Sequence, residues 1–472
     1  MKTKILLAVI LSIILASCAP ASISTPTEKP IPTATITFTP IPPTPTLTPT
    51  PTPENLADTK DLQIWVEQYV NAYGGKVTVN GVEMDTSQIT DNIRKNAESF
   101  TQVKEINGMA YSFLMVNNAP LAIQDENGKW QEATIKRIAS LAGLHFNITG
   151  IYDEKVLMKK NFTSFSSQWA FMWNIFRPDS KEKYSFDRTD YDVRFAQEIG
   201  GDNIQLFHLV WGWRNALPTW LVKGDFTNDE LLQIMTEHIK KTVSRYKGKV
   251  ATWSVVNESF GSSHTTGNSS FWGDKLGNDV EQGTKWIGLA FMSAHESDPD
   301  AKLILNDACI EFGKDTKCVW SGDKSSEIFS LVKTLKEKEY PIDGIGFQMH
   351  LSGYEFLSAN QKEQKMQQLT EQIERYKDIG VEVSITELDI CMSGVAGTTK
   401  ERYEKQFDIY KTVIDTAIKS GVKDFAVFGV RDEQSWLIST YGIQDCDPSL
   451  FNSQGIKPAY YAVTQAMFEN MR

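Results

Sequence analysis

Residues 251–258 read Ala-Thr-Trp-Ser-Val-Val-Asn-Glu, and residues 381–389 read Val-Glu-Val-Ser-Ile-Thr-Glu-Leu-Asp. Each stretch opens with a short apolar run that predicts a buried strand, Ala251–Val256 and Val381–Thr386, and each carries a glutamate where the strand ends. Six more runs of this kind lie on either side: Leu144–Ile148, Phe162–Phe165, Ile204–Leu209, Lys302–Leu305, Gly344–Gln348 and Asp424–Gly429. The chain therefore contains eight candidate strands.

Longer helical patterns lie between these strands, at Asp229–Tyr246, Gly283–Ser297, Ser326–Lys338, Gln361–Ile379 and Lys400–Ser420. Strands and helices that alternate over roughly 340 residues favour an α/β fold of the (β/α)8 TIM-barrel type. An open doubly wound sheet would be expected to carry a Gly-rich phosphate loop, and neither GxGxxG nor the Walker A pattern occurs. We therefore predict a (β/α)8 barrel over residues 131–472.

The composition of the 472-residue chain restricts what it binds. An excess of 59 acidic over 48 basic residues gives a net charge of -11, which argues against sequence-independent binding of nucleic acid. The 12 Trp, 15 Tyr and 24 Phe supply many flat apolar faces, which serve either as ordinary core or as platforms for sugar rings.

The first 53 residues are predicted to lie outside any fold. Lys2 and Lys4 precede the apolar run Ile5–Ala16, which is too short to span a bilayer and is typical of a secretion signal. The run ends at Cys18 in a string that resembles the bacterial lipobox, so residues 1–18 predict a lipoprotein signal peptide; a plain signal peptide is the alternative. The prediction places the protein outside the cell, on a bacterial surface, with Cys18 lipidated and holding the chain to the membrane.

A stalk and a small module are predicted to follow. Residues 19–53 are the predicted stalk, because Pro20–Pro53 holds 11 Pro and 11 Thr, a composition that cannot bury a core. Residues 54–130 read as a separate α+β module with helices at Asp61–Tyr73 and Thr86–Ser99 and strands at Met109–Met115 and Pro120–Gln124. This module is either an interaction or carbohydrate-binding unit or a packing extension of the barrel.

Four cysteines remain beyond Cys18: Cys309, Cys318, Cys391 and Cys446. In an oxidising exterior the local pairing joins Cys309 to Cys318 and Cys391 to Cys446, and four free buried thiols are the alternative. No CxxC spacing and no HExxH pair occurs, so we predict neither a metal site nor a cofactor.

The two strand-end glutamates, Glu258 and Glu387, are the candidate catalytic residues. In a (β/α)8 barrel the active site lies at the carboxyl ends of the strands, which would bring these side chains to one cleft. Two carboxyls in one cleft are the usual requirement of glycoside hydrolysis: one protonates the leaving oxygen, and the other attacks the sugar carbon or activates water. A single glutamate at a strand end is more often solvated or ion-paired, so the flanking residues decide the interpretation.

Asn257-Glu258 and Thr386-Glu387-Leu388-Asp389 resemble the acid/base and nucleophile signatures of glycoside hydrolase family 10, the retaining β-1,4-xylanases. Further blocks agree: Leu209-Val210-Trp211, Asn306-Asp307, Asp343-Gly344-Ile345-Gly346-Phe347-Gln348-Met349-His350, Ser435-Trp436-Leu437 and Pro458-Ala459-Tyr460-Tyr461. The resemblance covers residues from about Gln131 to Met471 and leaves the module and stalk unexplained.

The resemblance implies a role for each matched residue. Glu258 would be the general acid/base and Glu387 the nucleophile, with their carboxyls roughly 5–5.5 Å apart. Asn257 would bind the 2-hydroxyl of the sugar, and Gln348 would line the same site. His350 would bind substrate and hold Glu387 ionised.

Three further residues complete the implied site. Asp389 would support His350, and Trp436 and Trp211 would be the aromatic walls against which sugar rings stack.

The chain also departs from the family's usual residues, mainly in the half of the cleft that holds the non-reducing side of the substrate. Gln168, Trp169 and Met172 stand where the family has Glu, Asn and Lys. On the third strand Phe207 and Gly212 replace two histidines, and His208 lies one place out of register. On the eighth strand Phe428 replaces Trp, and Arg431 stands where Thr is common.

The interpretation that follows is a surface-anchored enzyme that hydrolyses β-1,4 bonds of xylan or a related plant-type β-glycan with retention. The departures favour a decorated xylan or another β-linked glycan as substrate. Two alternatives remain open from the sequence: a non-catalytic glycan-binding lipoprotein on the same barrel, and a wall-associated adhesive protein that acts through residues 54–130.

Overall fold

The computed structural model describes residues 54–150, 154–167, 171–177, 179–200, 203–260, 270–313 and 323–472. All of these described residues belong to one compact unit. The predicted signal peptide with Cys18, the predicted stalk, Cys318, Gln168 and Trp169 lie outside the described residues. No helix in these described ranges is both long enough and apolar enough to cross a membrane.

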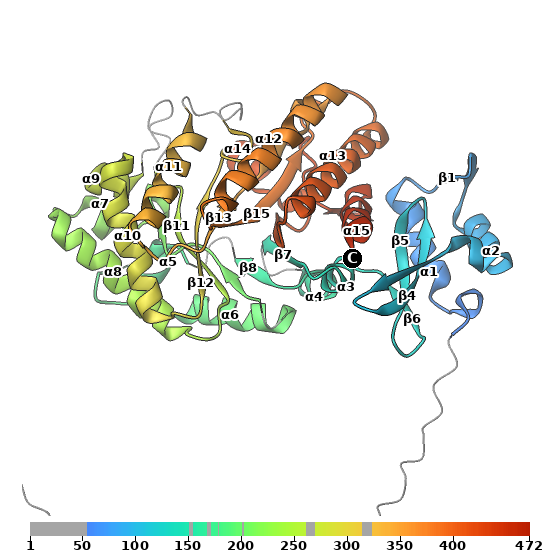
Figure 1. The fold of residues 1–472 in the computed structure, drawn as a ribbon, viewed down its shortest axis with the longest axis horizontal. Coiled ribbons are helices and arrows are strands. Elements are labelled where there is room, and N and C mark those ends of the chain that lie inside the picture. The colour runs from blue at the N-terminus through green and yellow to red at the C-terminus, as the bar shows by residue number, and fades with distance from the viewer. Residues whose placement is uncertain are drawn as a thin grey trace, which may run out of the picture. The chain divides into compact units, whose positions relative to one another are not determined.

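One parallel sheet forms the barrel (Figure 1). Its strands are β7 (His145–Gly150), β8 (Phe165–Ser167), β9 (Gln205–Leu206), β10 (Val210–Trp211), β11 (Thr252–Asn257), β12 (Lys302–Asp307), β13 (Gly344–Phe347), β14 (His350–Ser352), β15 (Glu382–Cys391) and β16 (Asp424–Phe428). The short strand β14 pairs only with β15, His350 opposite Asp389. They pair in the order β10-β11-β12-β13-β15-β16-β7-β8, and β9 also pairs with β11, so β9 and β10 share the third position. The predicted (β/α)8 fold is confirmed. Two predicted strands differ from the observed ones: β8 begins at Phe165, where the predicted strand Phe162–Phe165 ends, and β10 lies beyond the predicted strand Ile204–Leu209.

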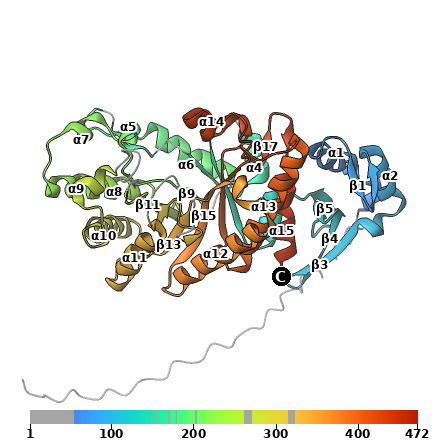
Figure 2. The same cartoon turned by 90° about the horizontal axis from the view of Figure 1, so that it is seen from above.

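Helices cover the outside of the sheet, as Figures 1 and 2 show. The long ones are α6 (Asp187–Ile199), α8 (Asn228–Arg245), α10 (Val280–Ser297), α11 (Lys324–Glu337), α12 (Ala359–Lys377), α13 (Thr399–Lys419) and α15 (Pro458–Asn470). Shorter ones are α3 (Ile135–Leu141), α4 (Lys155–Asn161), α5 (Trp173–Phe176), α7 (Thr219–Lys223), α9 (Phe271–Leu276) and α14 (Trp436–Tyr441).

Local sequence fixes where several of these helices begin. Helix α8 starts with a capping box in which the Thr227 hydroxyl accepts from the Glu230 backbone and the Glu230 carboxylate accepts from the Thr227 backbone. The same device opens α12 at Ser358 and α13 at Thr398. Because each cap satisfies amide groups that would otherwise lack partners, the helix start is set in the sequence itself.

The module before the barrel is α+β, as predicted. It contains α1 (Leu62–Ala72), β1 (Val77–Val79), β2 (Val82–Met84), α2 (Thr86–Lys95), β3 (Thr101–Ile106), β4 (Met109–Val116), β5 (Ala119–Gln124) and β6 (Trp130–Glu132). Strands β3 to β6 form an antiparallel sheet in chain order, and β1 pairs with β2.

This module packs against α15, the last helix of the barrel. The Phe113 ring meets Phe468 edge-to-face at 4.8 Å, and the Tyr69 ring meets Tyr461 at 5.0 Å. The Lys104 ammonium donates to the Phe468 carbonyl at 2.5 Å, which places a positive charge at the C-terminal end of the helix. The boundary at residue 131 stays a prediction, and the contacts show a module seated on the barrel.

One predicted disulfide is present: Cys391 is bonded to Cys446. It joins the end of β15 to the segment between α14 and α15. Cys309 is also disulfide-bonded. The predicted Cys309–Cys318 pair involves a residue outside the described ones, so that pairing stays a prediction.

Candidate active site

The carboxyl ends of four neighbouring strands meet at one place. Asn257 is the last residue of β11 and Glu258 follows it in a left-handed conformation (φ 50°), with its N–H donating to the Asn306 carbonyl at 3.0 Å. Asn306 lies near the end of β12, and Gln348 directly follows β13. Glu387 lies within β15. Adjacent parallel strands thus bring both predicted catalytic carboxyls to the same edge of the barrel.

One chain of hydrogen bonds links the two carboxyls. The Gln348 amide donates to Glu258 Oε1 and to Asn257 Oδ1, both at 3.2 Å. The Asn306 amide donates to Asn257 Oδ1 at 2.9 Å and to Glu387 Oε1 at 2.7 Å. These side chains are mutually fixed, which is the rigidity that a catalytic constellation requires.

A glycine makes room for the central residue of this chain. A Cβ at Gly346 on β13 would lie 2.3 Å from Asn306 Oδ1 and 2.8 Å from the Thr386 methyl carbon. The Thr386 hydroxyl donates to the same Asn306 oxygen at 2.6 Å. Asn306 is therefore held on both sides, with its amide hydrogens free to serve the two neighbours named above.

Glu258 lies in surroundings that favour its protonated form. Burial raises the pKa of this half-buried carboxyl, the Lys324 charge acts in the opposite direction, and the buried Asp307 carboxyl raises the pKa further. Trp211 Nε1 donates to Glu258 Oε2 at 3.0 Å. The group is thus disposed to hold a proton while keeping two donors for its ionised form.

Glu387 lies in surroundings that favour the ionised form. It is only 5% exposed, and burial alone would raise its pKa, but the hydrogen bond and charge of His350 outweigh burial and the net pKa is lowered. His350 Nε2 lies 3.4 Å from Glu387 Oε2. The two carboxyls are therefore driven in opposite directions, as acid and nucleophile roles demand.

His350 is held as a cation by a second carboxylate. Its Nδ1 lies 3.1 Å from Asp389 Oδ1. Burial would lower the pKa of His350, but Asp389 and Glu387 on either side raise it to about 10. Trp436 Nε1 in turn donates to Asp389 Oδ2 at 2.8 Å. A line of contacts thus runs from Trp436 through Asp389 and His350 to Glu387.

Both predicted aromatic walls stand beside this line. The half-buried Trp436 lies 4.8 Å from the His350 ring and 6.1 Å from Phe428. Trp211 lies 5.0 Å from Trp213, on the side of Glu258. One tryptophan therefore accompanies each carboxyl.

Comparison with known proteins agrees with this geometry, since the sequence model of Glycosyl hydrolase family 10 matches residues 131–466. The chain belongs to glycosyl hydrolase family 10. The predicted resemblance, from about residue 131 to 471, is confirmed over the matched range.

Curated relatives and solved structures of the family are similar to this chain. Endo-1,4-beta-xylanase B of Thermotoga neapolitana is 30% identical over 359 residues, which cover 72% of this chain and 94% of the relative. A beta-1,4-xylanase of Dictyoglomus thermophilum is 34% identical, covering 62% of this chain and 77% of the relative. The crystal structure of xylanase 10B from Thermotoga petrophila RKU-1 in complex with xylobiose superposes with a TM-score of 0.63 at 28% identity, covering 73% of this chain and all (100%) of that chain.

The departures from the family's usual residues that fall on described residues lie on both sides of the site: Met172 and Phe207 on the Trp211 side, and Phe428 beside His350 and Trp436 on the Glu387 side. Met172 and Phe207 are buried, and both line an apolar hollow together with Phe171, Trp173, His208, Trp211 and Ala216. Arg431 instead forms an ion pair with Glu154 at 2.5 Å, which ties the segment after β16 to the start of α4. The Trp211 side of this family 10 site is therefore more apolar than its Glu387 side.

Some residues of the site received no role in the sequence analysis. Asn306 was seen only as part of a matching block, although its amide joins the two carboxyls. His208 is a second such residue. Its Nδ1 lies 2.9 Å from Ser254 Oγ, and burial lowers its pKa to about 4 although the Glu387 charge acts in the opposite direction. Lys324, 2.5 Å from Asp307, carries the charge that acts on Glu258 and lies in a helix far along the chain. Only spatial proximity identifies it.

Among the residues that the structure describes, no group of three or more His, Cys, Asp or Glu side chains is placed to hold a metal ion.

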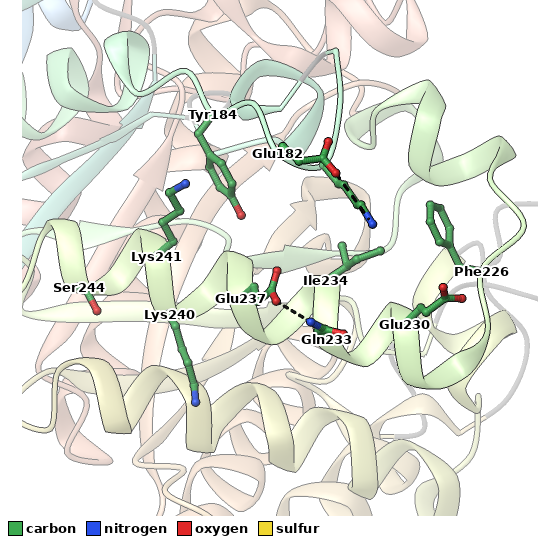
Figure 3. Close-up of a pocket in the computed structure, with 11 residues that line it drawn as sticks. Glu182, Tyr184, Phe226, Glu230, Gln233, Ile234, Glu237, Lys240, Lys241 and Ser244 are labelled. Carbon is green, nitrogen blue, oxygen red and sulfur yellow. Dashed lines mark hydrogen bonds and ion pairs between the residues drawn. The ribbon is translucent and has the colours of Figure 1, made fainter.

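Another hollow on the described surface lies away from this site. It has a volume of about 830 Å³ and is lined by α8 and by the segment before α6 (Figure 3). Glu237 accepts from Gln233 at 2.8 Å there, and the Lys241 ammonium covers the Tyr184 ring at 3.9 Å. The hollow shares no residue with the carboxylate pair, so its size does not make it the reaction site.

Proposed function

We propose that this chain hydrolyses β-1,4-glycosidic bonds of xylan or a related plant-type β-glycan with retention at the anomeric carbon. Glu258 is the acid/base and Glu387 the nucleophile. The observation that carries the proposal is the pair of linked carboxyls in opposite environments: burial raises the pKa of Glu258, and His350 holds the pKa of Glu387 low against burial.

The first step forms a bond between the enzyme and the sugar. Glu258 gives its proton to the glycosidic oxygen as the bond from that oxygen to the anomeric carbon breaks, and a Glu387 oxygen bonds to the same carbon. In the second step Glu258, now a carboxylate, takes a proton from water, and the water oxygen displaces Glu387. Glu258 therefore has to exist in both protonation states, for which Trp211 and Gln348 supply donors to its ionised form.

The neighbours of Glu387 suit the charge changes of these steps. A positive partner at 3.4 Å, His350, keeps the nucleophile ionised before attack. Asn257, Gln348 and Asn306 form a polar floor between the two carboxyls, to which the 2-hydroxyl of a bound sugar would hydrogen-bond. We expect the carboxyls to lie roughly 5–5.5 Å apart, the separation of a retaining enzyme.

The choice of substrate rests on relatives and on the apolar half of the site. The similar curated proteins are xylanases, and the solved relative binds xylobiose. Met172 and Phe207 offer no hydrogen bonds to a sugar, each of which contributes about 0.5–1.5 kcal/mol in other sites. We therefore propose that the chain favours a decorated xylan or another β-glycan over plain xylan.

Product analysis tests the activity. The full chain is incubated with glucuronoxylan, arabinoxylan, mixed-linkage glucan and cellulose, and soluble products are identified by mass spectrometry. We expect xylo-oligosaccharides from the wild type and none from Glu387→Gln. Equal hydrolysis by both would show that Glu387 is not the nucleophile, and silence across the panel with retained glycan binding would favour the non-catalytic alternative.

We further propose that Cys18 is lipidated and anchors the enzyme at the outer face of a bacterial membrane, with residues 19–53 as the stalk. The lipobox-like string before Cys18 supports this. Incorporation of a labelled fatty acid into the wild type, lost in Cys18→Ser, is the expected result. A Cys18→Ser protein that stays in the membrane fraction would overturn it.

A further inference from the structure

A row of aromatic side chains leads from the nucleophile to the surface. The row begins at His350 beside Glu387, continues through Trp436 at 4.8 Å and ends at Tyr441, whose ring meets Trp436 edge-to-face at 5.5 Å. Exposure rises along it: Trp436 is half-buried, and Tyr441 is 65% exposed, the highest of any aromatic in the described part of the chain.

Tyr441 is also held in place more firmly than its exposure implies. It ends the short helix α14, and Gly442 follows in a left-handed conformation (φ 70°) that closes the helix. The segment beyond is fixed to the nucleophile strand by the Cys391–Cys446 disulfide and by the Met392 N–H, which donates to the Cys446 carbonyl at 2.6 Å.

A side-chain contact adds to this attachment. The Ser393 hydroxyl donates to Asp445 at 2.8 Å. A platform fixed before binding loses little conformational entropy when a ligand covers it, so it contributes more to affinity than a mobile ring would.

We propose that Tyr441 is a sugar-binding platform that holds a unit of the glycan chain beyond the one facing Trp436. The inference rests on the proposed glycanase function. The apolar face of a pyranose suits an exposed ring, and large rigid aromatics supply contact area at low entropic cost. Because the Tyr441 ring contacts Trp436, which lies beside the reaction centre, a glycan chain that extends outward past Trp436 would reach Tyr441.

Substrate length provides the test. We compare Tyr441→Ala with wild type on an aryl β-xyloside, which has one sugar at the cut, and on xylo-oligosaccharides of increasing length. We expect Tyr441→Ala to lower kcat/KM about 5- to 10-fold on the longest substrates, mainly through KM, and to leave the aryl xyloside within twofold; each tenfold corresponds to about 1.4 kcal/mol. Tyr441→Phe keeps the ring and should stay near wild type.

A matched control separates binding from damage to the fold. Tyr191 on α6 is also an exposed tyrosine that touches a neighbouring ring, Phe195 at 6.1 Å, but it lies on an outer helix of the barrel. Tyr191→Ala should leave the length dependence unchanged. A Tyr441→Ala enzyme that loses activity equally on all lengths, or on none, would overturn the inference alone. A wild type inactive on every xylan would overturn both it and the proposed function.

Discussion

We predict that Asp389→Asn loses activity at a higher pH than the wild type does as the solution is made more acidic, so its pH range of activity is narrower. The substitution keeps the size of the side chain and leaves an amide oxygen to accept from Trp436 Nε1, but it removes the negative charge 3.1 Å from His350 Nδ1. Asp389 is the largest of the influences that raise the pKa of His350 to about 10 against burial. Without that charge, less opposes the effect of burial, and the pKa of His350 falls.

The magnitude follows from the same contacts. A pKa of about 10 against an ordinary 6.5 for histidine corresponds to about 5 kcal/mol in favour of the imidazolium. This is the net value after burial has opposed it, so the two carboxylates together supply more than about 5 kcal/mol, and Asp389 supplies the larger part. If its removal costs about 5 kcal/mol or more, burial and the remaining carboxylate leave the pKa of His350 at or below its ordinary value. The proton that His350 and Glu387 share would then reside more often on Glu387, because the weaker base His350 no longer provides the charge that lowers the pKa of Glu387.

The sign of the effect is fixed by which form of Glu387 reacts. The nucleophile has to be ionised, so a higher pKa of Glu387 moves the acid limb of the kcat/KM profile to higher pH. The alkaline limb, which reports the protonated Glu258, should move little. The assay is kcat/KM against pH for wild type and Asp389→Asn on one aryl glycoside.

A control variant removes another buried carboxyl. Glu311 is 3% exposed and acts on His350 only through its charge, with no ion pair to it among the described residues. Glu311→Gln should leave the acid limb nearer to wild type than Asp389→Asn does. An Asp389→Asn profile whose acid limb coincides with that of the wild type would refute the argument that Asp389 maintains the charge of His350.

Three further predictions concern packing. Lys457→Met should lower the free energy of unfolding by about 3–5 kcal/mol, measured by urea unfolding, because it leaves the buried carboxylate of Asp432, now 2.9 Å from the ammonium, without its partner. Phe468→Ala should cost about 3–5 kcal/mol in the same assay and destabilise module and barrel together, since its ring packs between them; two separate transitions with only one shifted would contradict this. Gly346→Ala should reduce kcat/KM at least about tenfold, or about 1.4 kcal/mol, and should also lower the melting temperature, because its methyl group would displace the buried Asn306. Unchanged kinetics would show that catalysis does not depend on the position of Asn306.

Much of the barrel was predictable because most of its strands and helices have recognisable patterns in their own stretch of sequence. The eight strands carry apolar runs of strand length, and helices such as α8 and α13 begin with capping boxes that are visible in the sequence. The third strand position was less predictable: the predicted run Ile204–Leu209 contains only the short strand β9, and β10 begins after the run, at Val210. The hydrophobic pattern of a sequence indicates which residues are buried, but it does not indicate where the hydrogen-bonded pairing of a strand is interrupted.

Of the candidate site, the sequence predicted the residues that stand at the ends of predicted strands. Glu258 and Glu387 each follow a predicted strand, so fold class and position together pointed to them, although the structure extends the second strand, β15, past Glu387 to Cys391. The pKa values of the two carboxyls also depend on other residues, such as Lys324, which acts on Glu258, and Asp389, which acts through His350. These effects arise from proximity in the folded structure. The attachment of Cys446 to the nucleophile strand was predictable as a pairing, but its consequence for Tyr441 was not.

The two halves of the site differ in how much structure holds them. On the nucleophile side Glu387 is supported by His350, Asp389 and Trp436, and the disulfide after β15 fixes the segment that follows Trp436. On the acid side Trp211 and Gln348 donate to Glu258, and the hollow next to Trp211 is lined by apolar residues such as Phe207 and Met172, whose side chains carry no hydrogen-bond donor. Directed contacts constrain geometry more tightly than apolar contacts do. A change of substrate can therefore be accommodated at the apolar hollow without disturbing the contacts that set the charge of Glu387.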